Sequence, residues 1–330
     1  MQISAFSKVI QHSPSRRDIL NRTAAFCLLG AFGLGAKTSQ AQDYPNRAIR
    51  MTVAYPPAGA TDILARLVGQ KMSDQLGQPI VIENKPGAGS TLGMDIAARA
   101  TPDGYNAFLS AVTSQAIASK LYPNAKSDLQ RDFIPVALIA SAPHVLVVNN
   151  EVPARNMSEF IQWLKANHKN VFYASQGTGT LSHRESELLG KHLGVEPTHT
   201  PYKGSSMAVT DLLSGTVSFM FDSVAASMQL VKSGKLRAIA VASSSRVPAM
   251  PELPTIAQAG IPGYEVDNWF GIYLPVGSPN EAVAAMAKAT IEVLHESDVV
   301  ESLVQNGYIV TPGDGAELAE RAKSDYARWG

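Results

Sequence analysis

Residues 49–72 read IRMTVAYPPAGATDILARLVGQKM and decide the fold. Apolar residues alternate over positions 49–53, as they do in a strand with one buried face. The prolines and glycine of residues 56–61 interrupt that pattern. Leu64, Val68 and Met72 then recur at helical spacing, and Gly77 ends the helix. The order of strand, glycine-rich turn and helix is typical of a parallel βαβ unit.

The same order recurs along the chain of 330 residues, a length that suggests two domains. Further strands are expected at residues 79–83, 107–112, 144–148, 171–174, 198–200, 217–221, 236–241 and 269–274. Further helices are expected at residues 92–100 and 282–294, after a cap at Ser158, and before Gly194 and Leu213. This alternation predicts an α/β fold of mostly parallel sheets flanked by helices.

Composition and charge exclude several classes of function. The chain has 28 basic and 28 acidic residues, so it lacks the basic excess that nucleic-acid binders usually show. A single cysteine argues against a disulfide framework and against a cysteine-based metal site. The histidines lack metal-ligand spacing and are expected to be solvated. In residues 87–93, three residues separate the last two glycines instead of the two of the dinucleotide-binding fingerprint, which disfavours a dinucleotide site. We therefore expect no metal and no cofactor.

Residues 1–41 have the features of a signal peptide. Arg16 and Arg17 lie in a basic head and resemble a twin-arginine motif, although a general secretory leader is the alternative reading. The following apolar run, residues 24–36, has 13 residues, whereas a bilayer span takes about 20. We expect cleavage near Ala41 and a periplasmic location for the mature chain.

Four turns at expected helix starts are rich in Gly, Ser and Thr, namely residues 58–62, 87–91, 177–182 and 203–206. Ligands of open parallel sheets bind beyond the carboxyl ends of the strands, where helices begin. Unpaired N–H groups at a helix start favour a carboxylate or phosphate. Each hydrogen bond to a charged group nets about 1.5–3 kcal/mol, and micromolar binding needs about 8 kcal/mol. Four to six such donors could hold a small organic anion.

For several residues the sequence allows either a structural role or a role in ligand binding. Asp62 either caps its helix or contacts the ligand, and Asp222 either accepts a hydrogen bond from the ligand or braces the Lys203 turn. Tyr202 is either a cavity wall or a core residue. Ser182 and the adjacent histidine point about 100° apart on a helix, and the chain has no Gly-x-Ser-x-Gly elbow. We therefore expect no catalytic residue and no enzyme.

Several segments together resemble the Bug receptors, the periplasmic solute-binding components associated with tripartite tricarboxylate transporters. The segments are YPNRAIR (44–50), YPPAGATD (55–62), VIENKPGAGS (81–90), TPDGY (101–105), GTGT with Ser-His (177–183), PYKG (201–204), FD (221–222) and PELPT (251–255). They keep the family's order over nearly all of the chain after the leader.

The resemblance implies a two-lobed periplasmic binding protein fold of type II that closes on its ligand. We expect one lobe from residues 43–142 plus 270–330 and the other from residues 143–269, with hinge crossings near Ala142 and Trp269. The implied function is capture of a small carboxylate (a dicarboxylate, an amino acid or an aromatic acid) by a monomer that delivers it to membrane permease subunits. The alternatives are a ligand-presenting sensor component and a periplasmic enzyme acting on organic acids.

In the family, the first two glycine loops bind a carboxylate largely through backbone amides, and loops of the second lobe select the rest of the ligand. The expected ligand-binding residues are Ala58, Gly59, Thr61, Asp62, Gly87, Ala88, Gly89, Ser90, Thr113, Gly177, Thr178, Thr180, Ser182, Tyr202, Lys203, Gly204 and Asp222. The family commonly has a glycine pair where this chain has Ala58-Gly59 and Gly89-Ser90, and these departures leave the ligand's identity open.

Overall fold

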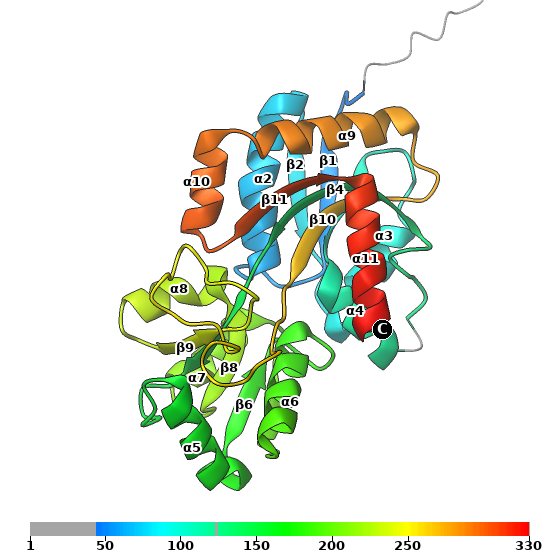
Figure 1. Ribbon diagram of the computed structural model, residues 1–330. Coiled ribbons are helices and arrows are strands. Elements are labelled where there is room, and N and C mark those ends of the chain that lie inside the picture. The colour runs from blue at the N-terminus through cyan, green and yellow to red at the C-terminus, as the bar shows by residue number, and fades with distance from the viewer. Residues whose placement is uncertain (1–43, 123–124, 330) are drawn as a thin grey trace, which may run out of the picture. The chain divides into compact units, whose positions relative to one another are not determined.

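The computed structural model describes residues 44–122 and 125–329, whose strands form two separate sheets (Figure 1). The expected signal peptide, residues 1–41, lies outside the described residues. Within those residues, no helix combines the length and the apolar character needed to cross a bilayer. We call the elements around the six-stranded sheet the first lobe and those around the five-stranded sheet the second lobe.

The sheet of the first lobe has the strand order β11-β4-β10-β3-β1-β2. Its strands are β1 (Ile49–Val53), β2 (Ile80–Asn84), β3 (Asn106–Ala111), β4 (Phe133–Ser141), β10 (Trp269–Pro275) and β11 (Ile309–Asp314). Strand β1 pairs in parallel with β2 and β3, whereas β10 is antiparallel to both β3 and β4. Strand β11 is antiparallel to β4. The first sheet therefore combines chain segments that precede and follow the second lobe.

The sheet of the second lobe has the order β7-β6-β8-β5-β9. Its strands are β5 (His144–Val148), β6 (Phe172–Ser175), β7 (Thr198–Pro201), β8 (Phe219–Ser223) and β9 (Arg237–Val241). Strand β6 pairs in parallel with β7 and β8, while β5 runs antiparallel to β8 and β9. In both sheets most strands share one direction, as expected. The reversed strands are β10 and β11 in the first sheet and β5 in the second.

Helices accompany both sheets (Figure 1). Those of the first lobe are α2 (Ala60–Leu76), η1 (Ala88–Ser90), α3 (Thr91–Ala98), α4 (Val112–Leu121), α9 (Asn280–Val293), α10 (Ser297–Gln305) and α11 (Gly315–Trp329). Those of the second lobe are α5 (Met157–Asn167), η2 (His168–Asn170), α6 (Leu181–Leu193), α7 (Ser205–Leu213) and α8 (Val224–Lys232). The α/β class and the alternation of strands and helices are confirmed.

The structure differs from the sequence prediction in a few elements. The sequence patterns did not indicate β4, β11, α4, α8, α10 or α11. The expected cap at Ser158 is wrong, because Asn156 caps α5: its side chain accepts a hydrogen bond from the Glu159 amide at 3.0 Å. The Asn156 side chain also donates to the Glu159 carboxylate, so the two residues satisfy each other at the helix start.

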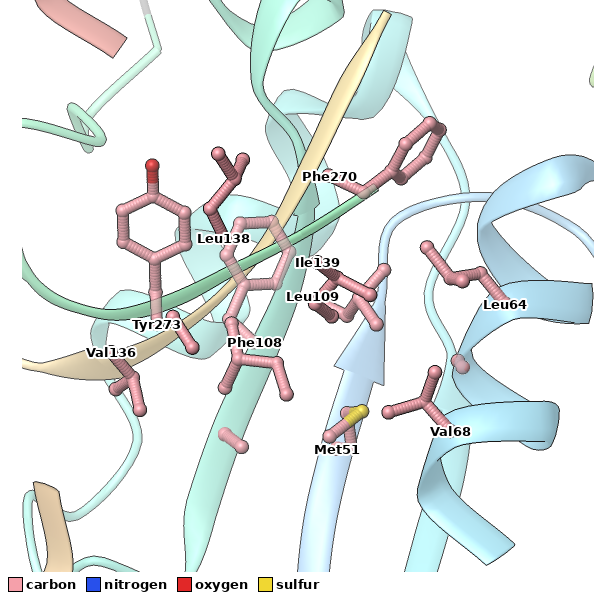
Figure 2. Close-up of a cluster of buried hydrophobic side chains, with 14 of the residues drawn as sticks. Met51, Leu64, Val68, Phe108, Leu109, Val136, Leu138, Ile139, Phe270 and Tyr273 are labelled. Atoms are coloured by element: carbon pink, nitrogen blue, oxygen red, sulfur yellow. The ribbon is translucent and has the colours of Figure 1, made fainter. Parts of the chain in front are cut away.

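The core of the first lobe lies between β1, β3, β4, β10 and α2, and Figure 2 shows its side chains. Met51 of β1 faces Leu64 and Val68 of α2, and all three are fully buried. Each such side chain contributes about 1.5–3 kcal/mol relative to an exposed one. This packing fixes α2 against β1 and thereby fixes the turn that joins them.

Helix α3 approaches the first turn very closely. A Cβ atom built on Gly93 would lie 2.7 Å from the Cα and Cβ atoms of Ala54 and from the Lys85 carbonyl oxygen. Real Cβ atoms do not come so near to backbone, so only glycine permits this approach. Gly93 therefore holds the start of α3 beside the turns that follow β1 and β2.

We expect Gly93→Ala to lower the free energy of unfolding by about 1–3 kcal/mol, because the added methyl overpacks against backbone. Gly69 of α2 gives a matched control, since a Cβ there would lie 3.4 Å or more from side-chain atoms of Ile82 and Ile80. Gly69→Ala should be neutral or stabilising by up to about 1 kcal/mol, because alanine favours the helix. Urea unfolding of the two variants measures the difference, and equal midpoints would contradict the close approach at Gly93.

Candidate functional site

A cavity of ≈ 340 Å³ lies between turns of the two lobes. It is lined by Ala54, Tyr55, Pro56, Pro86, Gly87, Ala88, Gly89, Ser90, Tyr122, Gln176, Gly177, Thr178, Thr180, Pro201, Tyr202, Lys203 and Gly204. A second cavity of ≈ 20 Å³, with room for about one water, shares four of these residues. We call them the main cavity and the small cavity.

The structure brings together three of the four expected turns and part of the fourth. Of the expected residues, the main cavity is lined by Gly87, Ala88, Gly89, Ser90, Gly177, Thr178, Thr180, Tyr202, Lys203 and Gly204. The small cavity is lined by Gly59, Thr61 and again Gly204. The remaining expected residues, Ala58, Asp62, Thr113, Ser182 and Asp222, line neither cavity.

Asp62 stabilises the first turn without lining either cavity. Its carboxylate accepts hydrogen bonds from the Ala58 amide at 3.0 Å and from the side chains of Arg66 and Asn84. Burial acts to raise the pKa of Asp62, but these hydrogen bonds and the nearby guanidinium hold that pKa below its ordinary value. The ionised carboxylate thus holds Ala58 in a left-handed conformation at the start of α2.

Asp222 braces the turns of the second lobe. Its carboxylate is fully buried and accepts hydrogen bonds from Gln176 at 2.8 Å, Ser205 at 2.7 Å and Ser227 at 2.6 Å. Gln176 lines both cavities and Ser205 begins α7. One buried carboxyl group therefore positions two neighbouring turns.

Two other expected residues make internal contacts. Ser182 accepts a hydrogen bond from the Gln176 amide at 3.1 Å. Thr113 donates to the Asp325 carboxylate at 2.6 Å and accepts from the Trp269 amide at 3.4 Å. Thr113 therefore ties α4 and α11 to the start of β10, next to one of the chain crossings.

The turn at residues 87–90 has an unusual backbone. Among the described residues, the non-glycine positions with positive φ are Ala58 at 65°, Ala88 at 48° and Ser90 at 85°. Gly89, between the last two, has φ of 59°. A non-glycine residue in this region costs about 1–2 kcal/mol, and such strain clusters at functional sites. All three positions lie on the two turns that the sequence singled out for a carboxylate.

This turn presents backbone donors at the start of α3. Within the described residues, the Ala88 and Gly89 amides have no hydrogen-bond acceptor. Successive N–H groups in left-handed conformations form a concave site that suits an anion, and the helix start adds partial positive charge. Residues 87–90 line the main cavity, so these donors lie where a ligand carboxylate could reach them.

The rest of the main cavity is largely uncharged. Of the described residues that line it, Lys203 carries the one charged side chain; it is exposed and makes no hydrogen bond or ion pair within the described chain. Two tyrosine hydroxyls are engaged, because Tyr202 donates to Asp211 at 2.6 Å and Tyr122 donates to the Thr178 carbonyl at 2.9 Å. Their rings therefore contribute mostly apolar surface.

Sequence reasoning missed several lining residues. Tyr55 and Pro56 line both cavities and immediately precede the first turn, so the end of the strand could have indicated them. Gln176 lies inside an expected loop, but its hydrogen bond to Asp222 is a tertiary contact. Tyr122 follows α4, a helix that the sequence did not predict, and no local signal marked it.

Two histidines support the turn at residues 177–180, and the expectation that they are solvated is wrong. The rings of His183 and His199 stack with centroids 4.0 Å apart. His183 accepts from the Gly179 amide at 3.4 Å, and His199 shares a 2.7 Å hydrogen bond with Ser175, whose oxygen accepts from the Gly177 amide. Burial lowers the pKa of both histidines, that of His199 to about 4 with a further contribution from the His183 ring.

A family model for the tripartite tricarboxylate transporter family receptor matches residues 64–330. The chain belongs to this receptor family. It is also similar to Protein BugT of Bordetella pertussis, with 34% identity over 301 residues that cover 89% of this chain and 92% of BugT. The resemblance to the Bug receptors is confirmed, as is the prediction of a receptor instead of an enzyme.

Solved structures of similar proteins share the fold. Periplasmic binding protein BugD has 34% identity and a TM-score of 0.83, over 87% of this chain and 96% of that one. Rpa4515 of R. palustris, solved with adipate, has 31% identity and a TM-score of 0.85 over 87% and 96%. MatC of Rhodopseudomonas palustris, with bound malate, has 33% identity and a TM-score of 0.82 over 87% and 98%. The two-lobed periplasmic binding protein fold is confirmed.

The two stacked histidines predict a pH dependence of this receptor's stability. Neutral His199 can accept a hydrogen bond from the Ser175 hydroxyl, whereas protonated His199 can only donate to the Ser175 oxygen, which already accepts from the Gly177 amide. In the folded protein His199 is protonated at about pH 4, whereas in the unfolded chain a histidine is protonated at about pH 6.5. The free energy of unfolding therefore falls as the pH drops from about 6.5 towards 4.

The variant His199→Gln lacks this titration and should lose less stability over that range than the wild type. Urea midpoints at about pH 7.5 and about pH 5 measure the loss for each protein. The exposed His295 provides the control His295→Gln, which should behave as the wild type does. An equal loss in all three proteins would show that His199 does not titrate in this way.

Proposed function

We propose that the chain is an exported receptor that captures a small carboxylate in the main cavity and delivers it to a tripartite tricarboxylate-type transporter. The observation that carries this proposal is the strained turn at residues 87–90, whose unpaired amides line the cavity at the start of α3. The adipate and malate in the structures of Rpa4515 and MatC support a carboxylate ligand.

The two lobes have distinct parts in this proposal. The first lobe, residues 43–142 plus 270–330, supplies the backbone donors for the carboxylate. The second lobe, residues 143–269, supplies Lys203 and the uncharged turns, which select the rest of the ligand. The crossings near Ala142 and Trp269 form the hinge. The 340 Å³ cavity suits a dicarboxylate, an amino acid or an aromatic acid.

The proposal also includes a location and a partner. Residues 1–41 direct export and are removed near Ala41, so that the mature receptor acts as a monomer in the periplasm. Its ligand-loaded form then engages the membrane permease subunits. Deletion of the gene should reduce uptake of the carboxylate that the purified protein binds, and expression in trans should restore it. Normal uptake combined with lost induction of a response gene would favour the sensor alternative.

Ligand capture is tested with a thermal-shift screen of dicarboxylates, amino acids and aromatic acids. A ligand that binds only the folded protein raises its Tm, and a concentration of 100 Kd stabilises by about 2.7 kcal/mol. We expect a dose-dependent rise with at least one carboxylate and none with its amide analogue. A screen in which no carboxylate raises the Tm would refute the proposal.

The site is tested with Gly89→Ala. Gly89 has φ of +59°, and its added methyl would lie 2.8 Å from the Tyr122 ring and 2.9 Å from the Thr178 carbonyl oxygen. We expect this change to abolish the ligand-induced rise in Tm. Gly77→Ala is the matched control, because Gly77 has φ of +65° and nothing within 4 Å. Lys203→Gln should weaken the rise without abolishing it, and a rise unaffected by Gly89→Ala would place the ligand elsewhere.

A further inference from the structure

Tyr122 joins the two lobes at the wall of the main cavity. It directly follows α4 of the first lobe, and its amide donates to the Ala118 carbonyl at 2.9 Å. Its hydroxyl donates to the Thr178 carbonyl of the second lobe at 2.9 Å. The side chain is half-buried and lines the main cavity. Tyr122 therefore makes a direct hydrogen bond between lobes beside the expected ligand position.

The Tyr122 ring lies against one glycine from each lobe. A Cβ atom built on Gly89 would be 2.8 Å from its Cε2 atom, and one built on Gly179 would be 2.9 Å from the same atom. Both glycines have positive φ, 59° and 80°. Any side chain at either position would push the ring away, so the aromatic ring fits between the two turns only because both are glycine.

This contact differs from those at the chain crossings. The Ala142 amide donates to the Asn268 carbonyl and the Trp269 amide donates to Thr113, and neither Ala142, Trp269 nor Thr113 lines the main cavity. Contacts at covalent crossings persist when lobes rotate about a hinge, whereas a contact at the cavity wall is made only when the turns approach each other. Tyr122 is thus placed to report and stabilise closure.

We propose that Tyr122 is the latch that holds the two lobes together over the ligand. It acts as a positioning residue: its hydroxyl and ring stabilise the closed arrangement and slow the release of whatever the cavity holds. The inference rests on the proposed function only for the identity of the retained molecule, which is the small carboxylate. Closure itself is a property of the chain and is measurable without any ligand.

The closed population is measured with two spin labels. Cys27 is the sequence's single cysteine, so Cys27→Ser gives a full-length background without a thiol. Gln70 of α2 and Lys191 of α6 are exposed and belong to different lobes, which makes Gln70→Cys and Lys191→Cys suitable label sites. Pulsed electron paramagnetic resonance then gives the distance distribution between the labels.

Without ligand, Tyr122→Ala and Gly179→Ala should move the distribution from a shorter to a longer distance, and Tyr122→Phe should move it less. Gly234→Ala is the matched control, because Gly234 also lies in the second lobe with φ of +70° and has nothing within 4 Å. It should leave the distribution unchanged. A melting curve for each variant separates a shift in closure from a loss of fold.

With adipate as the probe, Tyr122→Phe should release the ligand about two- to tenfold faster than the wild type, as expected for one lost hydrogen bond. Ligand-free distributions that are identical in the wild type and Tyr122→Ala would overturn the latch. Failure of every carboxylate to bind the wild type would instead overturn the proposed function, while the ligand-free comparison would still decide the role of Tyr122.

Discussion

The structure depends on a strained turn that its surroundings hold in place. Residues 88–90 all have positive φ, although only one of them is glycine. Such a turn persists because neighbouring groups determine its path: α3 packs on Ala54 through Gly93, and β2 enters the turn from a paired position in the sheet. The favourable packing of the first-lobe core offsets this local cost. The result is a set of fixed amide donors that needs no charged side chain.

In both lobes, buried polar side chains hold the cavity turns in place through hydrogen bonds. Asp62 in the first lobe and Asp222 in the second are nearly or fully buried, and each accepts hydrogen bonds from groups on cavity turns. Ser175 and the stacked His183 and His199 hold the amides of residues 177 and 179 in the same way. Buried carboxyl groups and imidazoles thus position the turns. Among the described residues that line the main cavity, Lys203 is the one with a charged side chain.

Much of the fold could be predicted from local patterns. Strand β1 alternates buried and more exposed residues, α2 has helical spacing and is followed by Gly77, and β5 is a short apolar run. Helix α4 could not, because residues 112–118 are buried on every side and lack an amphipathic pattern. Because α4 was not predicted, Tyr122 was not recognised as a lining residue. Thr113 was expected to follow a strand, whereas it lies at the start of a helix. The three turns around the main cavity were predicted from composition and topology, whereas Gln176 and the stacked histidines reached their places through long-range contacts.

The position of β10 has a consequence for biosynthesis. This strand lies in the middle of the first sheet, between β3 and β4, yet it is made only after the whole second sheet has been synthesised. The sheet of residues 144–241 is contiguous and can assemble as the chain emerges. Until residues 269–275 have been synthesised, β3 and β4 each expose an unpaired edge, and such edges can pair with other chains and aggregate. A nascent chain interrupted before that point would therefore be a natural client for chaperones.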